Sequence, residues 1–88
     1  DQLETYYNLI KDSEPRATYS SSGGYQYMYF YVSDTLLDAT KAWCESMSLS
    51  LYSGSSTETR IIYFDTVGHE IDIYVLGDGT IRIVIWEP

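Results

Sequence analysis

The chain has 88 residues, a length that suits one domain and is too short for two. Its formal net charge is −8, from 13 acidic and 5 basic residues. This charge repels phosphate backbones and anionic membrane surfaces, so it argues against direct nucleic-acid binding and favours a basic protein partner. The sequence has no run of about 18 apolar residues, so we expect residues 1–88 to form one domain without a transmembrane segment.

Cysteine usage leaves the cellular compartment open. Cys44 is the single cysteine, so no intrachain disulfide can form. This fits a reducing cytosol without excluding a bacterial envelope or a secreted domain. The sequence begins with Asp rather than Met. We therefore leave the localisation open between the cytoplasm and, if a leader was removed, an extracytoplasmic compartment.

The first third of the chain predicts a helix, an edge strand and a turn. Residues 1–12 place Leu3, Tyr6, Tyr7 and Ile10 on one face of a helical period, and Pro15 ends that pattern. Residues 17–19 form a short edge strand in this prediction. Residues 20–24, rich in Ser and Gly, form a turn.

A tyrosine-rich strand followed by a second helix is predicted next. Residues 25–33 alternate between two faces, one of which carries Tyr25, Tyr27, Tyr29 and Tyr31. Ser33 or Asp34 then caps a helix over 35–47. Its apolar stripe consists of Leu36, Thr40, Trp43 and Met47, widened by Leu37 and Cys44.

The remainder predicts strands over 48–52, 59–66, 70–76 and 80–86. Ile71, Ile73 and Val75 match Ile81, Ile83 and Ile85 across a hairpin only if the loop has an odd number of residues. A three-residue loop, Gly77-Asp78-Gly79, meets this condition, with Gly79 supplying a positive φ. For the preceding hairpin, an even loop around Val67-Gly68 places Ile62 and Phe64 beside Ile71 and Ile73.

These registers predict an α+β fold in which two short helices pack on one face of a mainly antiparallel sheet. The sheet has four to six strands and ends in a C-terminal three-stranded meander. The expected core face carries Ile62, Phe64, Ile71, Ile73, Val75, Ile81, Ile83 and Ile85. The opposite face carries Ile61, Tyr63, Asp72, Tyr74, Leu76, Arg82, Val84 and Trp86, which is more apolar than a plain solvent face.

Catalytic and metal-binding patterns are weak. His69, the single histidine, is best explained as a hydrogen-bonding turn residue, and Cys44 as a small core residue. Structural zinc sites need several Cys or His ligands. Carboxylates near one another, such as Glu70 and Asp72, do not by sequence alone form the unlike pair in a cleft that acid–base catalysis requires. We therefore expect no enzyme activity, no metal and no cofactor.

Tyrosine is the informative feature, because ten residues are Tyr and tyrosine is enriched in recognition surfaces. It is also a common strand residue, which explains the same pattern without a binding role. The predicted partner-binding residues are Tyr27, Tyr29, Tyr31, Tyr74 and Trp86 as anchors, with Asp65, Glu70 and Asp72 as acidic contacts.

Two functional hypotheses follow. The first is a non-enzymatic protein-binding domain, acidic and tyrosine-rich, such as a small inhibitor or an immunity-type protein for a basic partner. The alternative is an accessory or structural module, such as the globular part of a bacterial envelope lipoprotein or an assembly subunit. A homodimer through the aromatic face is compatible with both hypotheses.

Overall fold

The computed structural model describes residues 4, 8, 17–20, 26–54 and 56–87. The helix expected over residues 1–12 lies outside this part of the chain, apart from Glu4 and Asn8, which are both helical. Tyr25 and the turn over residues 20–24 also fall outside it, apart from Ser20.

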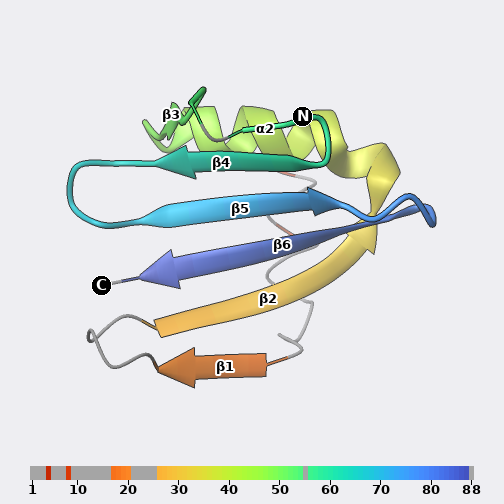
Figure 1. The fold of residues 1–88 in the computed structure, drawn as a ribbon, viewed down its shortest axis with the longest axis horizontal. Helices are drawn as coiled ribbons and strands as arrows, with labels where there is room; N and C mark the ends of the chain where they lie inside the picture. Colours follow the sequence, from red (N-terminus) through yellow and green to blue (C-terminus); the bar gives the residue numbers. More distant parts are fainter. Residues whose placement is uncertain (1–3, 5–7, 9–16, 21–25, 55, 88) are drawn as a thin grey trace.

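The described strands form one antiparallel sheet (Figure 1). Their order across this six-stranded sheet is β1-β2-β6-β5-β4-β3. The bounds are β1 Ala17–Ser20, β2 Gln26–Ser33, β3 Ser50–Leu51, β4 Arg60–Phe64, β5 Glu70–Val75 and β6 Thr80–Glu87. The last three strands are neighbours in chain order, and β6 also pairs with β2, so the C-terminal strands and the β1–β2 hairpin form one continuous sheet.

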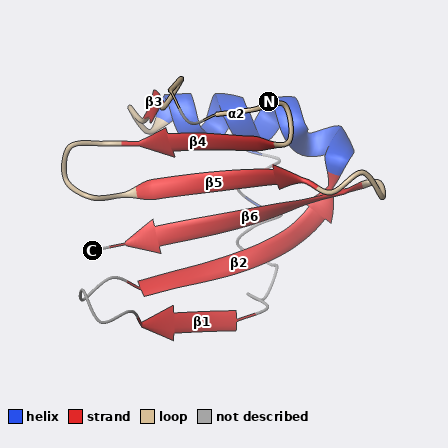
Figure 2. Ribbon diagram, viewed as in Figure 1, coloured by secondary structure: helices blue, strands red, loops and turns tan. Residues whose placement is uncertain are grey.

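A 3-10 turn and one α-helix connect β2 to β3 and lie behind the sheet in the view of Figure 2. The 3-10 turn η1 spans Asp34–Leu36, and α2 spans Leu37–Ser46. Ser33 caps the turn as expected, because its hydroxyl oxygen accepts a hydrogen bond from the Thr35 amide at 3.3 Å. The fold is therefore a mixed α+β fold. Of the two predicted helices, the structure describes one in full, which consists of η1 and α2.

The buried side of α2 differs in part from the predicted stripe. Thr40 and Cys44 are buried, as expected, and the Thr40 hydroxyl donates to the Leu36 carbonyl at 2.7 Å. Ala39 is also buried, whereas Met47 lies exposed just beyond the end of the helix. The prediction for Met47 was wrong because the helix ends at Ser46 and Ser48 adopts a left-handed φ of 64°.

The β5–β6 hairpin has the predicted register. Ile73 pairs with Ile83, and Val75 pairs with Ile81. The Leu76 amide donates to the Thr80 carbonyl, which leaves the three residues 77–79 as the loop. Gly79 has a φ of 91°, a region that side-chain-bearing residues rarely adopt, so the predicted role of this glycine is confirmed.

The β4–β5 hairpin differs from the prediction by one residue. Tyr63 pairs with Ile71, and the Asp65 amide donates to the His69 carbonyl, so this loop also has three residues rather than an even number. The Asp65 carboxylate accepts hydrogen bonds from the backbone amides of residues 67, 68 and 69 at 2.9–3.0 Å. Gly68 supplies a φ of 107°. This local turn sets the register.

A slip of one residue exchanges the two faces of β4. Ile61 and Tyr63 therefore face the helix, and Tyr63 is only 3% exposed. Ile62 and Phe64, which were predicted in the core, share the opposite face with Asp72 and Glu70. The expectation that Tyr63 belongs to the outer aromatic surface was wrong.

The core lies between the sheet and α2. Its fully buried members are contributed by the two central strands β5 and β6, and by the helix. The buried residues of this cluster are Val32, Ala39, Cys44, Leu49, Ile61, Tyr63, Ile71, Ile73, Ile81 and Ile83. In the part of the chain that the structure describes, no helix is both long enough and apolar enough to cross a membrane.

Candidate functional site: the open sheet face

One face of the sheet is not covered by any described helix or strand. This open face points away from α2, toward the viewer in Figure 1. The residues of the open face are identified from the strand register, because residues paired across neighbouring strands lie on the same face of the sheet. They are Tyr29, Tyr31, Arg60, Ile62, Phe64, Glu70, Asp72, Tyr74, Arg82, Val84 and Trp86.

The strand residues predicted to bind a partner are brought together on the open face. Tyr29 pairs with Val84 and Tyr31 pairs with Arg82, while Glu70 pairs with Trp86. The backbone of Tyr27 lies opposite Trp86 in the same register, and its side chain is outside the described part of the structure. Tyr29 and Tyr31 of β2 therefore face away from α2, and Tyr31 is 42% exposed.

One end of the open face is an arginine cluster, formed by Tyr29, Tyr31, Arg60, Tyr74 and Arg82. The Arg82 guanidinium lies 4.6 Å from the Tyr29 ring centre and 5.6 Å from that of Tyr74. The Arg60 guanidinium lies 5.5 Å from the Tyr74 ring centre. Guanidinium groups at these distances are attracted by the ring faces, so the cluster holds two cations among tyrosines.

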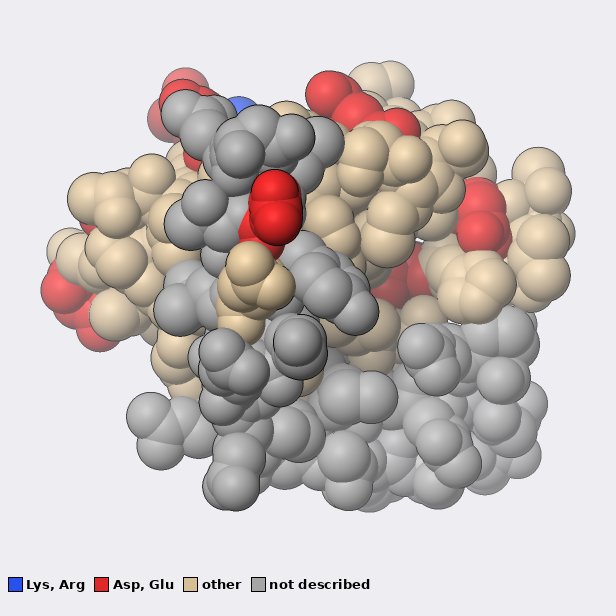
Figure 3. Space-filling model, turned by 180° about the vertical axis from the view of Figure 1, so that it is seen from behind, with Lys and Arg blue, Asp and Glu red and all other residues tan. Residues whose placement is uncertain are grey.

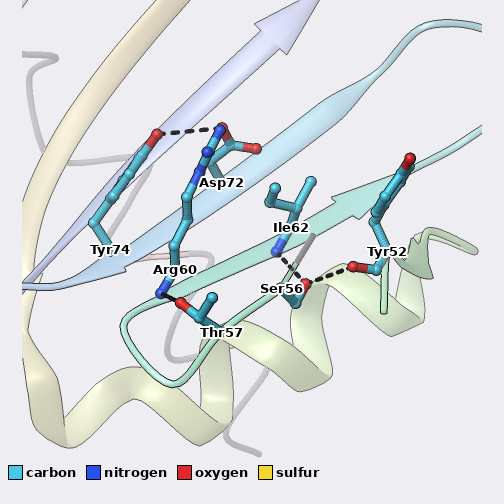
Figure 4. A network of polar contacts seen from close by, with 7 residues as sticks. All are labelled: Tyr52, Ser56, Thr57, Arg60, Ile62, Asp72 and Tyr74. Carbon is cyan, nitrogen blue, oxygen red and sulfur yellow. Dashed lines mark hydrogen bonds and ion pairs between the residues drawn. The ribbon is translucent and has the colours of Figure 1, made fainter. Parts of the chain in front are cut away.

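Asp72 is a polar partner of two members of this cluster, Arg60 and Tyr74 (Figure 4). Its side chain is buried, with the residue 2% exposed. The Arg60 Nη2 and the Tyr74 hydroxyl approach one carboxylate oxygen at 3.4 and 3.5 Å. A buried carboxylate needs such partners, so Asp72 positions Arg60 and Tyr74. It lies inside the face and not at a rim where it would meet a partner directly.

A second polar network fixes the segment that leads into β4 (Figure 4). The Ser56 hydroxyl donates to the Tyr52 carbonyl at 2.8 Å and accepts from the Ile62 amide at 3.1 Å. The Thr57 hydroxyl oxygen accepts from the Arg60 amide at 3.1 Å. These bonds tie the β3–β4 connection to the edge of the sheet. They place the ring of Tyr52 5.3 Å from that of Phe64.

Asp65 lies in the turn at the other end of the open face. Besides accepting the three turn amides, it contacts the His69 Nδ1 at 2.7 Å. Desolvation acts to raise the pKa of Asp65, but these hydrogen bonds together hold it below its usual range. His69 is thus a turn residue, as predicted, and the Asp65 carboxylate is largely occupied within the turn.

Glu70 is the carboxyl of the open face with the most unusual environment. Desolvation raises its pKa to about 7, and a hydrogen bond to Asp72 and the negative charge of Asp72 act in the same direction. Arg60 opposes the shift. The Glu70 carboxyl therefore holds its proton to a higher pH than an ordinary glutamate does, and it lies close to Asp72, which Arg60 contacts.

A pocket of about 450 Å³ opens beside Glu70. Its described walls combine three aromatic rings with two carboxyls and one imidazole. They are Tyr52, Phe64, Asp65, Gly68, His69, Glu70 and Trp86. None of these described lining residues is Lys or Arg, so this end of the open face differs in charge from the arginine cluster.

Two residues considered for chemistry are structural. Cys44 is fully buried in the core, and burial raises the pKa of its thiol to about 12. His69 is paired with Asp65 in a turn. Among the described residues, no three or more His, Cys, Asp or Glu side chains are grouped so as to hold a metal ion.

Sequence reasoning missed Arg60, Arg82, Tyr52 and Phe64 as site residues. Arg82 was placed on the correct face, but its role depends on Tyr29, which belongs to a strand that is distant in sequence. Arg60 and Phe64 were missed because of the β4 register. The motif Asp65-x-x-Gly68 was the available signal, because it is typical of a turn closed by a carboxylate and a positive φ.

Comparisons of the chain with protein-family models, with curated proteins and with solved structures found no match. The function is therefore inferred from the geometry of the open face.

Proposed function

We propose that this protein is a non-enzymatic protein-binding module that engages a basic partner through the open face of its sheet. The observation that carries this proposal is a sheet face that no described element covers and that is rich in aromatic side chains. Antiparallel sheets commonly bury one face against the core and present polar residues to solvent on the other. Aromatic rings placed on such a face provide large contact area with little loss of side-chain entropy on binding.

The exposure of the rings supports a recognition role. Tyr31 and Tyr52 are 42% and 46% exposed, and Tyr29, Tyr74 and Trp86 are half-buried. The rings are therefore accessible and at the same time held by neighbours, such as the edge-to-face contact between Tyr29 and Tyr31. Rigid, accessible aromatic residues are typical anchors of protein interfaces.

The net charge of −8 supports a basic partner. Figure 3, which views the molecule from the helix side, shows Asp and Glu at several places and very little Lys or Arg. The exposed acids of the helical segment are Asp34, Asp38 and Glu45. A field of this sign accelerates association with a positively charged protein and is screened by salt.

The Glu70–Asp72 pair is the feature that most resembles a catalytic arrangement, since its carboxyls have unlike environments. Only Glu70 lines the pocket, however, because Asp72 is buried under Arg60 and Tyr74. The other pocket carboxyl, Asp65, is occupied by its turn. One accessible carboxyl among aromatic rings suits binding better than acid–base catalysis.

Selection of peptides from a displayed random library tests the proposal. The wild-type protein is the target, and the variant Tyr31→Glu, which replaces the exposed ring of the arginine cluster with a charge, is used for counter-selection. We expect enrichment of peptides rich in Lys or Arg that bind the wild type at least about tenfold more tightly than the variant. Their affinity should fall as salt rises from 50 to about 500 mM.

Peptides that bind wild type and variant equally, or no enrichment, would contradict the proposal. Self-association is examined in parallel by sedimentation of both proteins over a range of concentrations. A wild-type dimer that Tyr31→Glu dissociates would assign the open face to a homodimer instead.

A further inference from the structure

We propose that the pocket formed by Tyr52, Phe64, Trp86 and Glu70 receives a lysine or arginine side chain of the partner protein. This inference deepens the proposed function and rests on it. The pocket has the two components of a cation site, namely aromatic rings and a carboxyl, in one concave place.

The rings supply the first component. Tyr52 and Phe64 meet edge to face at 5.3 Å, with an interplanar angle of 63°, and Trp86 adds a third ring to the lining. A cation above the face of Trp, Tyr or Phe is attracted by the ring quadrupole, most strongly by Trp. The aliphatic part of a lysine or arginine side chain also packs on such rings, while its charge remains near polar groups.

The carboxyl supplies the second component. Glu70 lies in the lining next to the aromatic walls, whereas the described lining has no Lys or Arg. The charged groups that act on Glu70 are Asp72 from its own strand and Arg60 from β4, and the pocket lining also contains the paired Asp65 and His69. A bound cation favours the ionised form of Glu70, so binding should strengthen as this carboxyl loses its proton.

The arginine cluster on the same face is an internal precedent for this chemistry. There, Arg82 of the chain itself lies near the rings of Tyr29 and Tyr74, and Arg60 pairs with the carboxylate of Asp72. The pocket presents the same types of groups, aromatic rings beside a carboxyl, with walls that are open to the outside. Its volume of about 450 Å³ lies within the usual range for ligand sites, about 300–1,000 Å³.

A titration followed by NMR tests this proposal at pH 8, where Glu70 is mainly ionised. The probe is Nα-acetyl-lysine N-methylamide, and the matched control is the same compound acetylated at Nε, which lacks the positive charge. We expect saturable shifts of the Trp86 indole and of backbone amides around Glu70 with the charged probe. The neutral control should bind at least about fivefold more weakly.

Two variants separate the two components of the site. Glu70→Gln removes the charge, and Tyr52→Leu removes one ring while keeping an apolar side chain at an exposed position. Each should weaken binding of the charged probe by about three- to tenfold. Glu58→Gln is the matched control, because it makes the same chemical change at an exposed residue outside the pocket, and it should leave the affinity unchanged.

The outcomes distinguish this inference from the function on which it rests. Equal binding of charged and neutral probes, shifts located elsewhere, or an affinity that Glu70→Gln does not change would overturn the cation pocket. The peptide selection has its own result, so peptides that bind the open face independently of Glu70 would keep the binding module and reject the pocket. Failure of both experiments would reject the proposed function itself.

Discussion

The two faces of the sheet are built from the same strands and are stabilised in different ways. On the covered face, Ile73 and Ile83 are fully buried against the core. On the open face, the intervening residues Asp72 and Tyr74 make polar and aromatic contacts with arginines. Alternation along each strand thus gives one face that packs against α2 and a second face on which the buried residues Ile62 and Val84 lie among exposed or half-buried aromatic rings and arginines.

The open face is held in shape by contacts among its own side chains, because no described element packs on it as a second layer. Arg82 lies between rings from two strands, and Asp72 joins Arg60 of β4 to Tyr74 of its own strand. The rings of Tyr29 and Tyr74 are therefore each held by an arginine from a neighbouring strand. Groups that are already positioned lose less entropy when a partner binds.

The largest expected difference between the faces is in stability. Ile73→Ala leaves a cavity in the core and should lower the free energy of unfolding by about 2–5 kcal/mol. Tyr31→Ala removes an exposed ring on the open face and should cost less than about 1 kcal/mol. Denaturant unfolding of both variants measures the difference. Equal destabilisation would show that Tyr31 contributes as much to stability as Ile73 does, and would contradict a difference in stability between the two faces.

A smaller loss of stability is expected from a change in the β4–β5 turn. This turn sets the register and so decides which β4 residues lie on which face. Asp65→Ala removes the acceptor of three backbone amides and should lower the free energy of unfolding measurably, by less than Ile73→Ala does. The control is Asp78→Ala, because Asp78 accepts from a single backbone amide, that of Thr80, together with the Thr80 hydroxyl. If the two variants lost the same stability, the Asp65 turn would have no special role in the register.

The smallest effect concerns the pH dependence of stability. The pKa of Glu70 is raised from 4.5 to about 7 in the folded protein, so the folded state binds this proton more tightly than the unfolded chain does. The resulting stabilisation is fully present below pH 4.5 and is lost as the pH rises through about 7. Because the side chain is partly exposed, we expect only a modest decrease.

Thermal unfolding at several pH values measures this decrease in the wild type and in Glu70→Gln. The variant should lose part of the decline between pH 4.5 and pH 8. Identical profiles for wild type and Glu70→Gln would mean that Glu70 ionises normally and that the open face does not desolvate it.

Much of the local structure was predictable because it depends on short-range rules. The strands, the Ser33 cap and the three-residue loop closed by Gly79 follow from alternation, capping and positive φ. Alternation also groups Tyr74, Arg82 and Trp86 on the face opposite the isoleucines of β5 and β6, but it leaves open whether the tyrosines of β2 share that face. The error in β4 arose because hydrophobic pattern alone does not distinguish Ile61 and Tyr63 from Ile62 and Phe64.

The sequence by itself determined the α+β class, the strand positions and the inward-facing isoleucines of β5 and β6, because each depends on residues close together in the chain. Only the tertiary structure decided that β2 lies beside β6, and therefore that Arg82 sits between Tyr29 and Tyr74. Strand order is set by packing between distant segments. The shifted carboxyl of Glu70 and the pocket beside it exist only once that packing has formed.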